Sequence, residues 1–373
     1  MCYPFRSVCL SWKGFDLETL DSLAQVLLII LFVGGLSLLA HWGRRNRKAE
    51  TSLIFTLLSV SFLVVALGVF VALAGLSRAS PLSNLPPKFS VSSAVVIVLA
   101  GLAGLALCIP PLRKVTGHRA TTGFEANPGP KGFASTNRFS GGWWSDPPIF
   151  FALWMYVVVL ASNAVILLAF TLTPERADYA LTSAGRLSLA TVALGQLPLV
   201  AIALLGVGFG VRRNFRETLA RLGYGPISPA QIGIALLFSV GALLLSFAAD
   251  ALFAALQPDL FERVGEVSEG LFSTAGLSPV SAILLALLIG VGAGIGEETL
   301  FRGAVQPVLG IVPTSILFAS MHVQYGPSLL LGYLLVIAVG LGLLRKHVNT
   351  TASFLAHAGY NFLAMLLTYF FGV

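Results

Sequence analysis

Residues 52–76 read SLIFTLLSVSFLVVALGVFVALAGL, a stretch without a charged side chain. About 20 apolar residues in a helix are enough to cross the hydrocarbon core of a bilayer. The apolar residues are continuous, whereas the strands of a membrane barrel need an alternation with a period of two. The stretch therefore predicts a membrane-spanning helix.

The whole chain has the composition of a membrane protein. Hydrophobic residues make up 56% of its 373 residues and charged residues 10%, against about 25% charged residues in a soluble domain. A bilayer accepts so much apolar surface when helices satisfy every backbone polar group. We therefore predict an all-α fold, a polytopic transmembrane helical bundle.

Ten apolar segments suggest about ten spans. Most of them are close to the length of a spanning helix, and the eighth is short. Their approximate bounds are Leu23–His41, Ser52–Leu76, Ser90–Leu112, Ile149–Leu172, Leu187–Val211, Ile232–Leu256, Val280–Leu300, Val308–Met321, Pro327–Leu344 and Thr351–Gly372.

The basic residues indicate the orientation of these spans. When alternate loops are placed on opposite sides, 16 of the 23 Lys and Arg residues fall on one side and seven on the other. Cytoplasmic loops are enriched in Lys and Arg, so we expect the first side in the cytoplasm and both termini non-cytoplasmic. The net charge of +7 then reports topology, and no nucleic-acid partner is expected.

The chain divides into three parts. Residues 1–22 form an N-terminal extension, and residues 23–279 form a transmembrane region with a flexible cytoplasmic loop at 113–148. Residues 280–373 form the third part, which carries most of the polar residues within spans. We expect the first apolar stretch to be a retained span and Trp143 and Trp144 to anchor the end of the loop at the interface.

Two acidic residues end the seventh span. In the stretch GIGEETLFRG, residues 294–303, Glu298 and Arg302 are four apart and face each other on a helix. Glu297 points about 100° away from Glu298 and has no local partner. We expect Glu298 to be neutralised by Arg302, with Glu297 facing another helix. The alternative is that both acids are solvated in the headgroup region.

Two later spans carry histidines. His322 ends the eighth span, while His357 and Asn361 share one face of the tenth. Polar groups in membrane helices normally face the interior of the bundle. Gly290 and Gly294, in a small-xxx-small spacing, would let a neighbouring helix come close to the acids. Asp250, His347 and three scattered cysteines, Cys2, Cys9 and Cys108, receive no catalytic or metal role.

These groups are suited to peptide hydrolysis. A buried carboxylate and an imidazole can activate water as a general base, and Glu297 with His322 are the candidates. An imidazole and an amide on one helix face can donate hydrogen bonds to the developing oxyanion, a role that His357 and Asn361 would fill.

The ordered blocks Glu-Glu-x-x-x-Arg, Phe-x-x-x-His and His-x-x-x-Asn over residues 280–372 resemble the CAAX protease and bacteriocin-processing (CPBP) family, which includes the Ras-converting CAAX endopeptidase. The resemblance implies an intramembrane glutamic endopeptidase without a metal or other cofactor. Glu297 and His322 would activate water, His357 and Asn361 would form the oxyanion site, and Glu298 and Arg302 would support them.

The resemblance also implies partners and a location. The substrate would be a membrane-embedded or lipidated peptide, with prenylated CAAX-type and bacteriocin-type peptides both left open. The protein would be integral to a membrane, the plasma membrane of a bacterium.

Two other interpretations of the residues stay open. Glu297, His322 and His357 could form the His₂Glu ligand set of a zinc peptidase, although the chain has no His-Glu-x-x-His motif. A non-enzymatic membrane scaffold, an immunity protein or a transporter would also carry ionisable residues within its spans.

Overall fold

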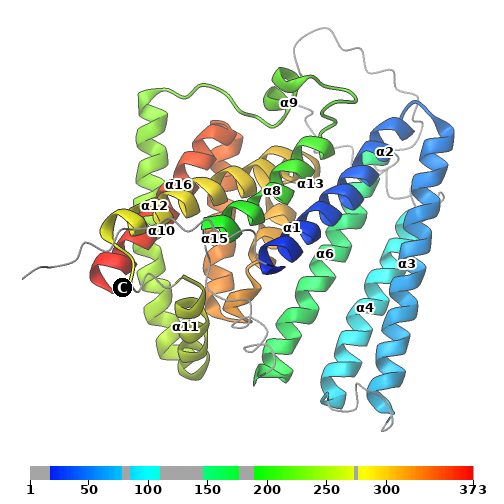
Figure 1. The fold of residues 1–373 in the computed structure, drawn as a ribbon, viewed down its shortest axis with the longest axis horizontal. Coiled ribbons are helices and arrows are strands. Elements are labelled where there is room, and N and C mark those ends of the chain that lie inside the picture. Colours follow the sequence, from blue (N-terminus) through cyan, green and yellow to red (C-terminus); the bar gives the residue numbers. More distant parts are fainter. Residues whose placement is uncertain (1–16, 78–84, 110–145, 176–188, 273–275, 373) are drawn as a thin grey trace, which may run out of the picture.

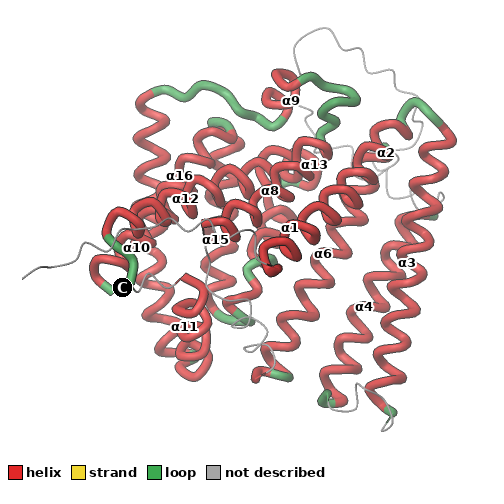
Figure 2. The backbone as a smooth tube through the Cα atoms, in the orientation of Figure 1, coloured by secondary structure: helices red, strands yellow, loops and turns green. Residues whose placement is uncertain are grey.

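The computed structural model describes residues 17–77, 85–109, 146–175, 189–272 and 276–372 (Figure 1). All the regular elements in these ranges are helices (Figure 2), so the predicted all-α class is confirmed. They are α1 Leu17–Ile29, η1 Ile30–Gly34, α2 Gly35–Gly43, α3 Arg47–Leu76, α4 Pro87–Cys108, α6 Pro147–Leu172, α8 Leu189–Gly206, α9 Phe215–Arg221, α10 Pro229–Leu256, α11 Pro258–Phe272, α12 Pro279–Glu297, η3 Glu298–Val305, α13 Gln306–Leu309, α14 Ile311–Ser320, η4 Val323–Tyr325, α15 Leu329–His347 and α16 Thr350–Phe371.

Local sequence explains where several helices begin. Ser228 caps α10 through the amide of Gln231, whose side chain bonds back to Ser228, and Pro229 follows at the first helical position. This capping box satisfies two backbone donors that the helix leaves free. Asn214 and Glu217 form the same arrangement at α9. Polar residues before an apolar run therefore set these boundaries.

Within the described ranges, eight helices are long and apolar enough to cross a membrane, and two more apolar helices are shorter. The eight candidates are Leu23–Gly43, Arg47–Leu76, Pro87–Cys108, Pro147–Leu172, Pro229–Leu256, Pro279–Leu309, Leu329–His347 and Thr350–Phe371, and the shorter helices are Leu194–Gly206 and Ile311–Ser320. Each of the ten predicted segments overlaps one of these helices. The number of spans that cross the bilayer and the orientation of the termini stay predictions.

The helices form two regions (Figure 1). Helices α3 and α4 pack along each other at one edge of the molecule, and α6 and α2 join them to the rest. On the other side, α12 packs along α16, and α8, α10 and α15 surround this pair. The polar residues predicted for the last spans lie in this second region.

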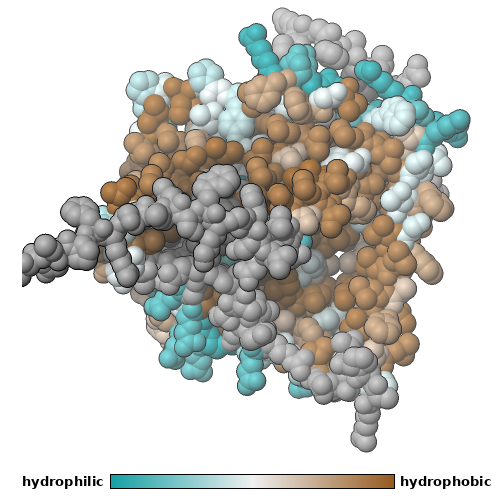
Figure 3. Space-filling model, in the orientation of Figure 1, coloured by the Kyte–Doolittle hydropathy of each residue, from teal (hydrophilic) through white to brown (hydrophobic). Residues whose placement is uncertain are grey.

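The surface has an apolar belt between two polar ends (Figure 3). Large hydrophobic side chains point outward along the belt, among them Phe55 and Phe62 of α3, which are 71% and 65% exposed. In water such a surface would drive association, whereas a bilayer solvates it. The protein is therefore an integral membrane protein.

The structure differs from the sequence-based predictions at α11 and at the start of α6. The amphipathic helix α11, with one acidic face, was not predicted, and Pro147 and Pro148 of the predicted loop belong to α6. Residues 1–16 of the N-terminal extension, residues 113–145 of the loop, and the predicted anchors Trp143 and Trp144 lie outside the described residues. The division into three parts stays a prediction.

Candidate active site

The acidic residues lie where α12 changes into a π-helix. Helix α12 ends at Glu297, and Glu298 begins the π-helix η3. Short π-helical turns within α-helices are rare and frequently mark functional sites. The sequence analysis assumed a continuous α-helix here. The change of helix type was missed because nothing in the local sequence distinguishes the two hydrogen-bonding patterns.

Glu298 is the centre of a buried ionic group. Its Oε1 accepts a hydrogen bond from His357 Nδ1 at 2.8 Å and lies 3.1 Å from Arg302 Nη1. Arg302 Nη2 also donates to the carbonyl of Ala338 at 3.3 Å. The predicted pairing of Glu298 with Arg302 is confirmed, and the participation of His357 is new. Because Glu298 is completely buried, the alternative prediction that this acid is solvated in the headgroup region is wrong.

Close helix packing brings this group together. A Cβ added to Gly290 of α12 would lie 2.7 Å from the carbonyl oxygen of Ala358 in α16, and one added to Gly294 would lie 2.9 Å from the ring of Phe354. The predicted small-residue contact therefore joins α12 to α16. As a result η3 and His357 lie within hydrogen-bonding distance, although Glu298 and His357 are 59 residues apart.

Phe318 of α14 connects the site residues. Its ring centroid lies 4.5 Å from Cζ of Arg302, and the rings of His322 and His357 lie 4.8 and 5.8 Å from it. A guanidinium over an aromatic face is attracted by the ring quadrupole. Phe318 therefore holds one cation and both histidines around a single apolar surface. Phe318 is the first residue of the Phe-x-x-x-His block. Its position four residues before His322 could have predicted that the two rings lie on the same helix face.

The two histidines are held in the same way by different partners. His322 Nδ1 lies 2.9 Å from the carbonyl oxygen of Phe318, which can only accept, so His322 donates from Nδ1. His357 bonds through its own Nδ1 to a carboxylate. Within the described part of the chain, neither Nε2 has a hydrogen bond. Both Nε2 atoms can therefore interact with a substrate or with water.

Glu297 and Asn361 are less constrained. Glu297 Oε2 is buried without a hydrogen-bond partner, and Asn361 has no side-chain hydrogen bond to any described residue. Over the same residues no hydrogen bond joins Glu297 to His322. Tyr325 lies beside His322, because the two rings stack with their centroids 6.2 Å apart.

Two residues near the site were missed by the sequence analysis. Tyr325 is one, and Gln196 of α8 is the other. The amide oxygen of Gln196 is buried without a partner and lies so close to Gly296 that a Cβ there would be 2.0 Å away. Gln196 is a polar residue within an apolar segment, and this was the signal that could have identified it.

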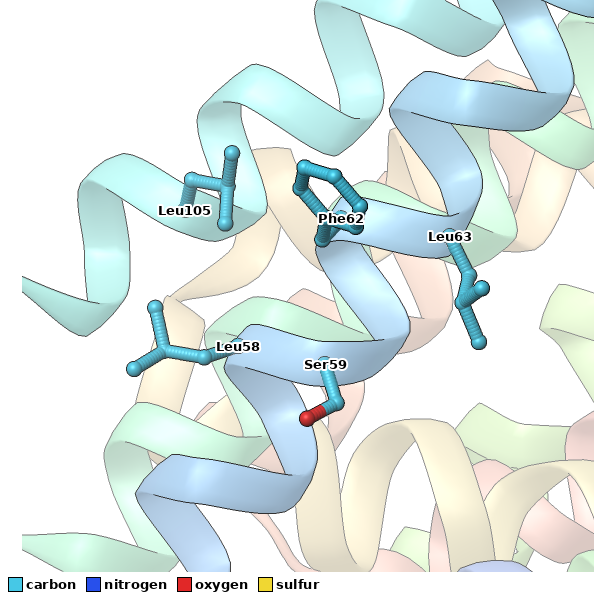
Figure 4. A pocket seen from close by; sticks show the side chains of 5 residues that line it. All are labelled: Leu58, Ser59, Phe62, Leu63 and Leu105. Carbon is cyan, nitrogen blue, oxygen red and sulfur yellow. The ribbon is translucent and has the colours of Figure 1, made fainter.

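In the described part of the chain, neither a group of metal ligands nor the surface depression of the molecule adds to this site. Over the described residues no group of three or more His, Cys, Asp or Glu side chains is arranged to hold a metal ion. The open depression in Figure 4 is lined by Leu58, Ser59, Phe62, Leu63 and Leu105 of α3 and α4, on the apolar surface at the opposite edge of the molecule. It carries no ionisable group.

The comparison with known protein families concerns the part of the chain that carries this site. Residues 279–363 match the Rce1-like family, described as type II CAAX prenyl endopeptidase Rce1-like. The predicted resemblance to the CAAX protease and bacteriocin-processing family is thus confirmed over these residues, which include all six candidate site residues. The match supports a CAAX-type membrane protease, a hydrolase. No curated protein and no solved structure matches the chain.

Proposed function

We propose that the protein is an intramembrane glutamic endopeptidase that uses a water molecule activated by Glu297 and His322. The observation that carries this proposal is the pair of imidazoles that both lie against the ring of Phe318. Each is held at Nδ1, and each has a different kind of partner. The partner of a ring nitrogen sets the protonation of the other nitrogen, so the two histidines are suited to different steps.

His322 is suited to bind and orient the water. Its Nδ1–H donates to a neutral carbonyl, so the neutral ring has a lone pair at Nε2. This lone pair accepts a hydrogen bond from water. Tyr325, stacked on the ring, restricts its orientation. Water held in this way can be deprotonated by a neighbouring carboxylate.

Glu297 supplies that carboxylate. Burying the Oε2 atom of Glu297 without a hydrogen-bond partner costs free energy, and a hydrogen bond from water or from the substrate amide would offset this cost. Glu297 accepts one proton from the water as its oxygen attacks the peptide carbonyl carbon. It returns this proton to the nitrogen of the leaving amine when the C–N bond breaks. The products are one carboxylic acid and one amine.

His357 and Asn361 stabilise the oxyanion. A role as donor requires a proton on His357 Nε2 in addition to the one on Nδ1, and a carboxylate partner stabilises the doubly protonated ring. Glu298 is that partner, and Arg302 shares its charge. Asn361, one turn further along α16, has a free side-chain amide to donate. Glu298 and Arg302 therefore act as positioning residues.

The substrate is a membrane-associated peptide. The site lies on helices that are long and apolar enough to span a membrane, so a peptide tethered by a lipid or by its own apolar segment reaches it from within the bilayer. The family match favours a prenylated CAAX-type peptide, and a bacteriocin-type peptide is the second class. The bacterial plasma membrane is the proposed location.

Cleavage of a defined peptide tests the proposal. The full chain in proteoliposomes is given a peptide with a fluorophore and a quencher on either side of a farnesylated cysteine followed by three residues. The same peptide without the farnesyl group forms a second arm. Wild-type protein should cleave at least the first. Glu297→Gln should reduce the rate by about 10²–10⁴-fold, the usual contribution of a general base.

The matched control is Glu269→Gln, an exposed acid on the separate helix α11. It should retain the wild-type rate. Full activity in both Glu297→Gln and His322→Ala would contradict the catalytic role and favour a scaffold, as would a wild type that cleaves neither peptide. Activity that a strong chelator removes and only zinc restores would instead support the zinc peptidase.

A further inference from the structure

Four arginines lie on segments that meet at one end of the molecule. Arg44 directly follows α2, Arg213 precedes α9, and Arg221 ends it. Arg345 lies in the last turn of α15, with its Nη2 3.3 Å from the position of a Cβ added to Gly223, two residues after α9 (Figure 1). We refer to Arg44, Arg213, Arg221 and Arg345 as the cationic cluster. Burial first, and then the charges of the other three members, lower the pKa of Arg221; burial first, and then the charge of Arg44, lower the pKa of Arg213. None of these residues belongs to the proposed catalytic machinery.

Backbone carbonyls hold most of the cluster in place. Arg213 donates to the carbonyl of Val207, Arg221 to that of Gly303 at 3.2 Å, and Arg345 to that of Arg302 at 3.1 Å. Carbonyl groups orient a guanidinium but do not neutralise it. Fixed, partly buried guanidinium groups whose remaining N–H donors have no hydrogen bond to the described residues are suited to a phosphate, which they can bind through two parallel hydrogen bonds.

The cluster has fewer negative than positive charges. Over the described residues, the carboxylates that act on it are Asp146, which pairs with Arg44, and Glu217, which also caps α9. Four guanidinium groups therefore face two carboxylates. Burial first, and the other guanidinium groups second, lower the pKa of Arg221 to about 10. Arg221 is still charged at neutral pH, so the excess of positive charge persists.

The cluster lies at the depth where lipid phosphates are expected. Arg44 directly follows the candidate span Leu23–Gly43, and Arg345 lies in the last turn of the candidate span Leu329–His347. The charged headgroups of a bilayer lie at the ends of such spans. The basic-residue distribution predicts that this end is cytoplasmic, and the cytoplasmic leaflet is rich in anionic lipids.

We propose that the cationic cluster is a binding site for a phosphate group, of the kind carried by an anionic phospholipid headgroup. The bound phosphate lies among the four guanidinium groups and offsets their mutual repulsion. Because Arg221 and Arg345 hold the carbonyls of residues 302 and 303, the same ligand also stabilises the π-helix η3 that carries Glu298 and Arg302.

Thermal unfolding of the purified full chain in a neutral detergent tests this site without any assay of activity. Dihexanoyl-phosphatidylglycerol, dihexanoyl-phosphatidylcholine and sodium phosphate are added separately at constant ionic strength. The melting temperature should rise with phosphatidylglycerol and not with phosphatidylcholine. A rise with sodium phosphate as well identifies a site for free phosphate, and a rise with the lipid alone identifies a headgroup site.

Variants connect this effect to the cluster. Arg213→Gln should raise the phosphatidylglycerol concentration of half-maximal effect about tenfold, because a hydrogen bond between two charged groups is lost. Among the described residues, the hydrogen bond of Arg213 is to the carbonyl of Val207 and not to η3, so this variant should fold. Arg47→Gln, an exposed arginine outside the cluster, is the matched control and should change the response by less than about twofold, since an exposed charge without a direct contact to the phosphate is screened by salt. No response to either anion, or an equal loss in Arg47→Gln, would overturn the proposal.

Discussion

The α3–α4 pair and the α12–α16 pair are built by the same packing principle and differ in their polar content. In both pairs glycine lets two long helices touch. A Cβ on Gly101 would lie 2.8 Å from the backbone nitrogen of Val65, much as one on Gly290 would lie 2.7 Å from a carbonyl oxygen of α16. After their first turns, however, α3 and α4 have no acidic or basic residue, whereas α12, η3 and α16 hold a buried acid, a cation and an imidazole.

The difference shows which feature marks function. Close approach through small residues is a general means of joining membrane helices, and it occurs here in a region without candidate chemistry. Ionisable residues within spans are costly and therefore rarely present without a role. A glycine pattern alone would have drawn equal attention to both pairs, and the acids distinguish them.

Removing the buried acid should have the largest effect. Glu298→Ala would leave Arg302 and His357 buried without their counter-charge, and loss of one partner of a buried ion pair costs about 3–5 kcal/mol. The free energy of unfolding, measured by titration with a denaturing detergent, should fall by that amount. Glu269→Ala on exposed α11 should change it by less than about 0.5 kcal/mol. An equal, small effect of both variants would show that the group is not a stabilising centre.

Adding a methyl group at either glycine contact should cause a similar loss of stability. Gly101→Ala and Gly290→Ala both force backbone atoms apart, and overpacking of this kind costs about 1–3 kcal/mol. Gly233→Ala in α10 is the control, because a Cβ there meets no atom within 4 Å. The two variants should differ in their rate of peptide cleavage: only Gly290→Ala, next to the candidate site, should also slow it. Equal loss of activity in both would mean that the α3–α4 pair also shapes the site.

Phe318→Leu should affect catalysis more than stability. The substitution keeps an apolar side chain but removes the ring that contacts Arg302, His322 and His357. Because misplaced catalytic groups lose part of their effect, we expect about a tenfold lower rate of cleavage. Leu317→Ile, at the neighbouring position, should leave the rate within about twofold of the wild type, since volume-conserving swaps are usually tolerated. A wild-type cleavage rate in Phe318→Leu would show that the Phe318 ring is not needed to position the site residues.

The smallest effect is expected in the α3–α4 region. Ser61 of α3 accepts a buried hydrogen bond from the indole N–H of Trp154 at 2.8 Å. Ser61→Ala leaves the buried indole N–H without this acceptor, so it should lower the free energy of unfolding by about 1–3 kcal/mol and leave cleavage unchanged. Loss of cleavage without loss of stability would contradict the separation of the two regions.

The comparison also shows what the sequence could predict. The apolar helices and the Glu298–Arg302 pair depend on residues close in the chain, and both were predicted. The bond between Glu298 and His357, by contrast, depends on how α12 packs against α16, which no local pattern describes. The gathering of Arg302, His322 and His357 around Phe318 is likewise a tertiary feature of three separate segments.

Local conformation limited the prediction in another way. The change from α12 to η3 alters the direction of the side chains that follow Glu297, and it was not expected from the sequence. Helix α11 was missed because its apolar residues are interrupted by acids. The short helix before His322 was predicted, because the apolar segment that precedes this residue is shorter than the other apolar segments.

The central claim is that the partners at Nδ1 give the two histidines different roles. Nitrogen-15 NMR of the protein labelled at its histidines measures the protonation of each ring nitrogen directly, with His322→Gln and His357→Gln assigning the signals. We predict a proton on Nδ1 in both rings. We also predict that Glu298→Gln changes the Nδ1 signal of His357, which bonds to that carboxylate, and leaves the Nδ1 signal of His322, which bonds to a backbone carbonyl, unchanged. A proton on Nε2 alone in either ring, or an equal change of both signals in Glu298→Gln, would contradict the account.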